Sequence, residues 1–137
     1  MGLILDSSVL IAAERQRQNA RQMLAAIART AGETEVALSV VTLIELAHGA
    51  ARANTTERKA KREQFIQELL MALPIHPVTV PVALRAGHID GENQAKGVRL
   101  PLADLLIGVT ALELGYSIAT GNLRHFQRIP GLSVMQF

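Results

Sequence analysis

The fold is decided by the first apolar stretch of the sequence, which reads Leu3-Ile4-Leu5-Asp6-Ser7-Ser8-Val9-Leu10-Ile11. A short apolar run such as residues 3–5 is typical of a parallel strand that is buried on both faces. The three polar residues that follow are good helix caps, so they predict a helix that begins near Val9. A strand that leads directly into a helix is the repeating unit of α/β folds.

The rest of the sequence continues this alternation of short strands and amphipathic helices. Strands are expected over residues 36–41, 75–80, 116–120 and 132–137. Helices are expected over residues 20–31, from 42 onward, from a cap at Thr55 or Thr56 to residue 73, and over 82–96, 102–114 and, as one turn, 123–126. Pro77 places the strand at 75–80 near a sheet edge. We expect a three-layer α/β/α sandwich with a central, mainly parallel sheet, formed by residues 1–137 as a single domain.

The composition favours a globular protein of the cytoplasm. Hydrophobic residues make up 49% of the 137 residues, enough to form one core. The absence of cysteine excludes disulfides, thiolate nucleophiles and cysteine-based zinc sites, and it fits a reducing compartment. The apolar run at residues 3–5 has no basic segment before it, and no apolar run is long enough to span a bilayer. We therefore expect neither a signal peptide nor a membrane association.

Three acidic residues, Asp6, Glu45 and Asp104, interrupt apolar segments that are expected in the core. Each has a structural explanation when taken alone. Asp6 can cap the helix that follows it, and Glu45 can form a capping box with Thr42. Asp104 lies in a first helical turn after Pro101, where a negative charge is favourable.

Taken together, the same three residues predict a metal site. Ligands of parallel α/β sheets bind beyond the carboxyl ends of the strands, and Asp6, Glu45 and Asp104 can all face that edge. Clustered carboxylates repel one another unless a cation joins them, and oxygen ligands without histidine or cysteine suit Mg²⁺, with Mn²⁺ as a possible substitute. Asn122 follows a strand at the same edge as a fourth candidate, although Gly121-Asn122 is also ordinary turn chemistry.

Charged residues elsewhere are consistent with a polyanionic partner. Without the three site acids, fourteen basic residues face nine acidic ones, an excess of five positive charges. The basic run at residues 58–62 can contact RNA phosphates or be an ordinary solvated helix face. Arg124 is a better candidate for a phosphate contact because it adjoins Asn122. His125 is interpreted as a packing or hydrogen-bonding residue, and aromatic residues are too few for a base-stacking platform.

Four segments together resemble the motifs of the PIN-domain family, and in particular its VapC-type toxins of type II toxin–antitoxin systems. They occur in the family's order and span almost the whole chain: residues 5–11, Glu45-Leu46 followed by Gly49, residues 102–107 and residues 119–126. The resemblance implies an endoribonuclease that hydrolyses RNA phosphodiester bonds with a water activated by Mg²⁺ or Mn²⁺. It also implies a homodimer that a cognate antitoxin protein neutralises.

Carried over position by position, the resemblance makes Asp6, Glu45 and Asp104 the metal ligands. Ser8 and Thr120 would then hydrogen-bond to these carboxylates and orient them. Asn122 would assist in catalysis, but many relatives carry an aspartate at this position. The amide keeps an oxygen and loses the charge, which puts a tightly held second metal in doubt.

Two other functions compete with this prediction. An aspartyl-phosphate enzyme would also place an aspartate after its first strand, but Ser8 stands where a haloacid-dehalogenase-like enzyme needs a second aspartate. A receiver-like domain needs a lysine at a strand end, and the candidate lysines lie in helices or loops. The second alternative is a non-catalytic module that binds RNA or protein with a degraded metal site, for which Asn122 is the only support.

Overall fold

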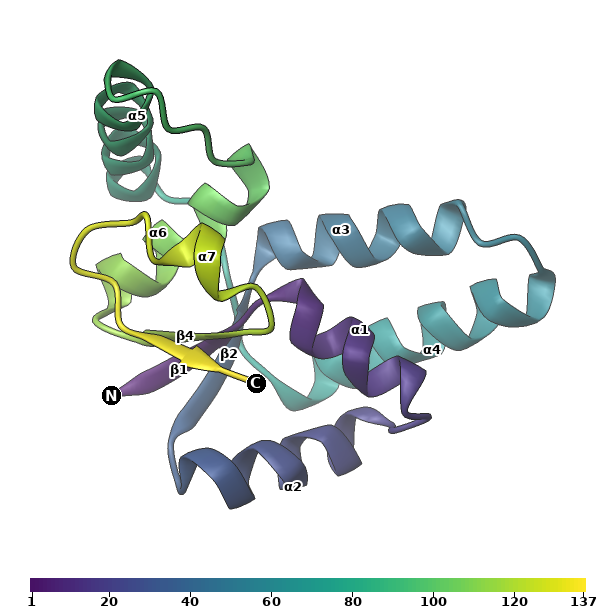
Figure 1. The fold of residues 1–137 in the computed structure, drawn as a ribbon. Helices are drawn as coiled ribbons and strands as arrows, with labels where there is room; N and C mark the ends of the chain where they lie inside the picture. The colour runs from purple at the N-terminus through teal and green to yellow at the C-terminus, as the bar shows by residue number, and fades with distance from the viewer.

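A computed structural model describes residues Met1–Phe137, in which strands and helices alternate (Figure 1). The strands are β1 (Gly2–Leu5), β2 (Glu35–Ser39), β3 (Ile75–His76), β4 (Ser117–Thr120) and β5 (Val134–Gln136). The helices are α1 (Ser7–Arg15), α2 (Ala20–Ala31), α3 (Val40–Ala51), α4 (Thr56–Ala72), α5 (Val80–Ala95), α6 (Leu102–Leu114) and α7 (Leu123–Phe126). None of these helices combines the length and the apolar character that crossing a membrane requires.

The five strands form one sheet in the order β3-β2-β1-β4-β5, and every neighbouring pair is parallel. In the centre, Ile4 pairs with Ala37 of β2 on one side and with Ile118 of β4 on the other. Because the strands are parallel, the carboxyl ends of β1, β2 and β4 meet at one edge of the sheet. The predicted edge position of β3 is confirmed.

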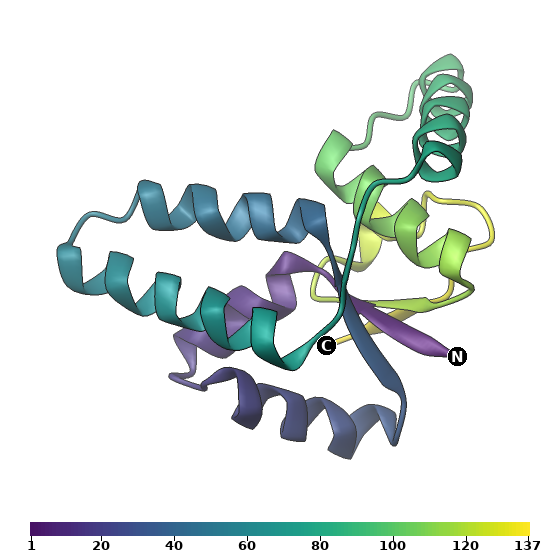
Figure 2. The same ribbon diagram turned by 180° about the vertical axis from the view of Figure 1, so that it is seen from behind.

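Helices cover both faces of the sheet, which confirms the predicted three-layer α/β/α sandwich (Figures 1 and 2). Leu3 and Leu5 of β1 pack on one face in a core that includes residues of α1, α2 and α4. Ile4, between them, packs on the opposite face with residues of α5, α6 and α7. Both figures show α3 and α4 extending away from the sheet as an antiparallel pair. The continuous burial of β1 explains its purely apolar sequence.

The expected strand at residues 36–41 was wrong at its carboxyl end. β2 ends at Ser39, whose hydroxyl accepts a 3.1 Å hydrogen bond from the Val41 amide and thereby caps α3. The alternative explanation of Glu45, a capping box with Thr42, is therefore wrong, because both residues lie inside the helix. Val40 and Val41 are β-branched and favour strands locally, but packing overrides that preference here.

The expected strand at residues 75–80 was likewise too long. Only Ile75 and His76 pair with β2, and Thr79 caps a helix that already begins at Val80. The Thr79 hydroxyl accepts a 3.3 Å hydrogen bond from the Val82 amide. At the other end of the chain, β5 covers three residues of the six expected at 132–137. At the ends of β2 and β3, pairing gives way to a helix cap that satisfies the backbone instead.

Candidate active site

Asp6 follows β1 directly and is buried, with 3% of its surface exposed. Its backbone amide continues the sheet by donating to Ala119 O at 2.9 Å. Its Oδ2 atom accepts hydrogen bonds from the Ser8 hydroxyl at 2.7 Å and from the Thr120 hydroxyl at 2.9 Å. Asp6 occupies the cap position of α1, but its side chain caps no amide there. The carboxylate is therefore held for something other than helix capping.

The two hydroxyls on Asp6 are themselves fixed by the turn that follows β4. The Gly121 amide donates to Ser8 Oγ at 2.9 Å, and the Asn122 amide donates to Thr120 Oγ1 at 2.8 Å. Since each hydroxyl oxygen already accepts a backbone hydrogen bond, its own hydrogen is free to point at Asp6. The start of α1 and the end of β4 are thus tied together through one carboxylate oxygen.

Glu45 lies in the second turn of α3 and is half-buried. Burial raises the pKa of Glu45 above its ordinary value, the negative charges of Asp6 and Asp104 raise it further, and the Ser7 hydroxyl opposes them. The Glu45 Oε1 atom is buried without a hydrogen-bond partner, and so is Asp6 Oδ1. Two carboxylate oxygens that have lost water and gained no donor are costly unless a cation reaches them.

Asp104 lies in the first turn of α6, as predicted, and contacts His125 from α7. His125 Nδ1 lies 2.5 Å from Asp104 Oδ2 and 2.9 Å from Asn122 Nδ2. An ionised carboxylate can only accept hydrogen bonds, so His125 Nδ1 carries the hydrogen when Asp104 is charged. Asn122 can donate to Nδ1 only when that nitrogen carries no hydrogen. Burial raises the pKa of Asp104, the hydrogen bond from His125 lowers it, and the charge of Asp6 raises it.

The donor chemistry of this cluster fits a hard divalent cation such as Mg²⁺. The three carboxylates act on one another electrostatically, and two of their oxygens are buried without partners. No three acidic or histidine side chains, however, converge closely enough to form a ready-made metal cage. Coordination by Asp6, Glu45 and Asp104 together would thus require their side chains to draw closer around the ion.

Comparison with known proteins assigns the chain to a family. The profile of the PIN domain matches residues 3–132, nearly the whole chain. The chain belongs to the PIN-domain family. Among curated relatives of this PIN domain, Ribonuclease VapC1 of Rickettsia felis is 30% identical over 135 residues, covering 98% of this chain and 96% of that protein. The tRNA(fMet)-specific endonuclease VapC of Salmonella typhimurium is 29% identical over 101 residues, covering 74% of each chain.

Solved structures agree with the PIN-domain assignment. The DNA-bound VapBC complex of Salmonella typhimurium contains a chain with a TM-score of 0.78 and 26% identity, covering 99% of this chain and 98% of that one. A chain of VapBC2 from Rickettsia felis, bound to a DNA fragment from the promoter, has a TM-score of 0.83 and 22% identity. That match covers 100% of this chain and 99% of that one, and at this identity it supports the fold alone.

Two side chains of the carboxylate cluster received no site role from the sequence. His125 was interpreted as a packing or hydrogen-bonding residue, and the structure places it on Asp104. Ser7 was interpreted only as a possible cap, yet its hydroxyl acts on Glu45. The spacing of Asn122 and His125, three residues apart around a helical turn, was the available indication that both face one point. Arg124 of the same turn is exposed.

Proposed function

We propose that this PIN domain is a metal-dependent endoribonuclease that hydrolyses RNA phosphodiester bonds, as the toxin of a toxin–antitoxin pair. The observation that carries the proposal is the buried Asp6, whose Oδ2 is fully engaged while Oδ1 is left without a partner beside Glu45. Buried carboxylate oxygens usually have a hydrogen-bond partner, and in this cluster Asp6 Oδ1 and Glu45 Oε1 both lack one. The relatives named ribonuclease and endonuclease VapC support the same chemistry.

In this proposal Asp6, Glu45 and Asp104 hold Mg²⁺, or Mn²⁺ in its place. A divalent cation bound there supplies charge to a phosphoryl oxygen and makes a water molecule more acidic. The protein contributes the fixed positions of the carboxylates. Ser8 and Thr120 hold the Asp6 carboxylate in one orientation, so it needs little rearrangement when the substrate arrives.

His125 and Asn122 have a separate role in this scheme. The His125 Nδ1–H group orients Asp104 and favours its ionised form, which is the form that binds a cation. Asn122 lies beside His125 and presents an amide, which binds a phosphate or a cation through dipoles rather than charge. This difference favours one tightly held cation over two. Arg124, exposed on the same helical turn, is placed to contact a substrate phosphate.

Solved structures of related chains support a protein partner. Several chains of this fold come from VapBC complexes, and VapBC-5 of Mycobacterium tuberculosis is described as a member of a family of toxin–antitoxin systems. We propose a cognate antitoxin protein and a homodimer for this chain as well. The cytoplasm, where RNA and a newly made antitoxin are both present, is the proposed location.

The decisive experiment is a cleavage assay on total cellular RNA with Mg²⁺, with Mn²⁺ and with EDTA, using protein free of bound antitoxin. Discrete products should form with either metal and disappear with EDTA and in Asp6→Asn and Asp104→Asn. The matched control is Asp90→Asn, which should cleave like wild type. Asp90 lies on α5, and its carboxylate only accepts a hydrogen bond from Gln94. Near-full activity of Asp6→Asn or Asp104→Asn would refute the proposal. A wild type without products in either metal would favour the non-catalytic binding module.

A further inference from the structure

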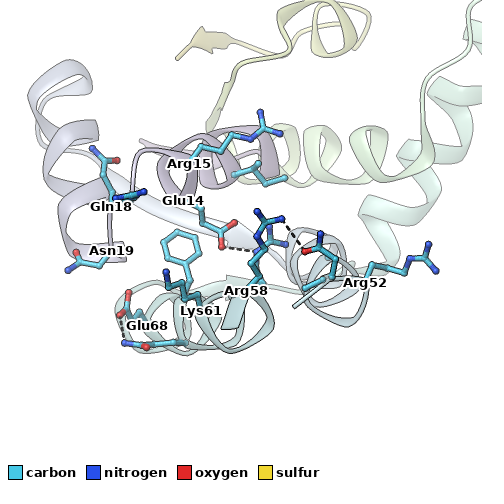
Figure 3. Close-up of a pocket in the computed structure, with 16 residues that line it drawn as sticks. Glu14, Arg15, Gln18, Asn19, Arg52, Arg58, Lys61 and Glu68 are labelled. Atoms are coloured by element: carbon cyan, nitrogen blue, oxygen red, sulfur yellow. Dashed lines mark hydrogen bonds and ion pairs between the residues drawn. The ribbon is translucent and has the colours of Figure 1, made fainter. Parts of the chain in front are cut away.

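A second concave region, outside the carboxylate cluster, lies between α1 and the α3–α4 pair (Figure 3). This basic groove has a volume of about 1030 Å³, and its cationic lining consists of Arg15, Arg17, Arg52, Arg58, Lys61 and Arg62. Figure 3 shows Arg15 on one side of the groove and Arg58 and Lys61 on the other, with Arg52 near the end of α3. Of the sixteen lining residues only three are apolar, so the groove does not suit an apolar helix.

The acidic residues of the basic groove are already engaged. Glu14 accepts a 2.8 Å hydrogen bond from Arg62 Nε, and Glu68 accepts a 3.0 Å hydrogen bond from the Ala20 amide. Six basic against two acidic side chains leave an excess of four positive charges, twice the net charge of +2 of the whole chain. The positive charge of this protein is therefore concentrated in the groove, which favours a polyanion as its occupant.

The cations differ in how free they are to bind. Arg62 is fixed, because it also donates to Leu46 O at 3.2 Å and its guanidinium fills the space beside Gly49. Arg15, Arg17 and Arg52 are exposed and form no ion pair. Arg58 is exposed as well, and its single side-chain contact is a 3.1 Å hydrogen bond to Asn54. Four arginines are thus available to a ligand.

Two helices, α1 and α3, lead from the proposed active site to the basic groove. Glu45, Gly49 and Arg52 are four and three residues apart on α3, so they lie on one face of that helix. On α1, Ser7 and Arg15 are two turns apart and also lie on one side of their helix. The Ser7 hydroxyl lowers the pKa of Glu45 by hydrogen bonding. Arg52 is about 10 Å from Glu45 along the helix axis. At a rise of about 3.4 Å per nucleotide in a stacked strand, this is a distance of roughly three phosphates.

We propose that the basic groove binds the RNA strand on one side of the cleaved bond, through the phosphates about three nucleotides away. The proposal rests on the ribonuclease function proposed above. The position of the groove along the same two helices as Ser7 and Glu45 favours RNA over an acidic segment of a protein, since a substrate strand must pass the site and extend beyond it. Phe65, the one aromatic residue of the groove, is buried and cannot stack on bases. The contacts are therefore to phosphates, and they position the strand without reading its sequence.

The test measures binding of an oligouridylate RNA in EDTA, which prevents cleavage, at several salt concentrations. Arg15→Ala, Arg52→Ala and Arg58→Ala should each weaken binding and reduce the slope of log affinity against log salt by roughly 0.7 for each phosphate that the variant no longer neutralises. Lys59→Ala removes a cation from α4 that does not line the groove and should leave the slope unchanged. Arg17→Gly should weaken binding without loss of stability, because Arg17 has a left-handed φ of 58° that glycine adopts freely.

Cleavage assays separate this proposal from the proposed function. In Mg²⁺ the groove variants should slow cleavage of the long RNA and leave cleavage of a dinucleotide, which cannot reach the groove, unchanged. If cleavage depends on Asp6 but the groove variants bind and cleave like wild type, the groove proposal fails and the ribonuclease stands. If no RNA is cleaved but the variants still lose RNA affinity, the groove stands and the ribonuclease fails. Equal binding of oligoglutamate, lost in the same variants, would overturn the proposal in favour of an acidic protein partner.

Discussion

The Thr120 hydroxyl donates a 2.9 Å hydrogen bond to Asp6 Oδ2, although the two residues are 114 positions apart in the chain. The pairing of β1 with β4 brings them together, since Leu5 pairs with Ala119 and each partner's next residue lies at the carboxyl end of its strand. The position of the carboxylate thus depends on a contact between the two ends of the chain.

Loss of this hydrogen bond should impair activity more than folding. We expect Thr120→Val to lower ribonuclease activity by roughly 10-fold to 100-fold, the usual effect of removing a residue that orients a metal ligand. Thr120→Ser keeps the hydroxyl and should restore most of the activity. The measurement is kcat/KM on one RNA substrate, with thermal unfolding as a check on the fold. Equal activity of Thr120→Val and wild type would show that Asp6 needs no such orientation.

The raised pKa values of Glu45 and Asp104 predict how stability depends on pH when no metal is present. A carboxyl group whose pKa is raised by folding stabilises the protein below its ordinary pKa, 3.8 for Asp104, and loses that contribution as the pH rises through the raised value. At neutral pH in EDTA the ionised groups therefore destabilise the fold. Asp104→Asn should raise the Tm there, and the gain should vanish at acidic pH.

Metal addition completes this test. Mg²⁺ or Mn²⁺ should raise the Tm of wild type by binding to the folded state, and should raise that of Asp104→Asn much less. Asp90→Asn, outside the site, should respond to pH and to metal as wild type does. A Tm of Asp104→Asn below that of wild type at neutral pH in EDTA would contradict the expected repulsion among the carboxylates.

His125 should affect the pH profile of the reaction. Its hydrogen bond lowers the pKa of Asp104, so His125→Ala should raise that pKa. Since the ionised carboxylate is the form that binds a cation, the acidic limb of the kcat/KM profile should move to higher pH. His88→Ala removes an exposed histidine that lies 2.9 Å from Glu92 and should leave the profile in place. An unchanged acidic limb in His125→Ala would separate His125 from the function of Asp104.

Gly49 should be unusually intolerant of alanine for a helical glycine. A Cβ atom at this position would meet the Arg62 guanidinium and displace it from Glu14 and from Leu46 O. At Gly91 of α5 a Cβ atom meets nothing, so Gly91→Ala should stabilise the protein by about 1 kcal/mol through helix propensity. Chemical denaturation of both variants should show this gain for Gly91→Ala and a loss of about 1 kcal/mol for Gly49→Ala. Equal gains would mean that Arg62 relocates at no cost.

Much of the fold could be predicted because local and global preferences agree in it. The apolar β1, the amphipathic α2 and the glycine-terminated α6 each formed where the sequence pattern placed them. The errors occurred where the local preference of a segment disagrees with its tertiary packing. Val40 and Val41 favour a strand locally, but Ser39 caps a helix that contributes to the cores on both faces of the sheet.

The candidate site could be predicted in part for the same reason. The rule that sites lie at the carboxyl ends of parallel strands led to Asp6, Glu45, Asp104 and Asn122 as one group. It could not lead to the basic groove, because Arg15, Arg52 and Arg58 come together only through the angle at which α1 meets the α3–α4 pair. That angle depends on side-chain packing over long sequence separations, which no local pattern encodes.

The pairing of β1 with β4 has a consequence for the time at which the candidate site forms during synthesis of the chain. Asp6 leaves the ribosome first, whereas Thr120 and His125 belong to the last part of the chain to be made. Because β1 pairs with β4, the Thr120 hydroxyl can reach Asp6 only after β4 has been made. An interrupted or still growing chain therefore carries the first acidic residue without the groups that orient it. The carboxylate cluster can therefore be ordered only late in the synthesis of the chain.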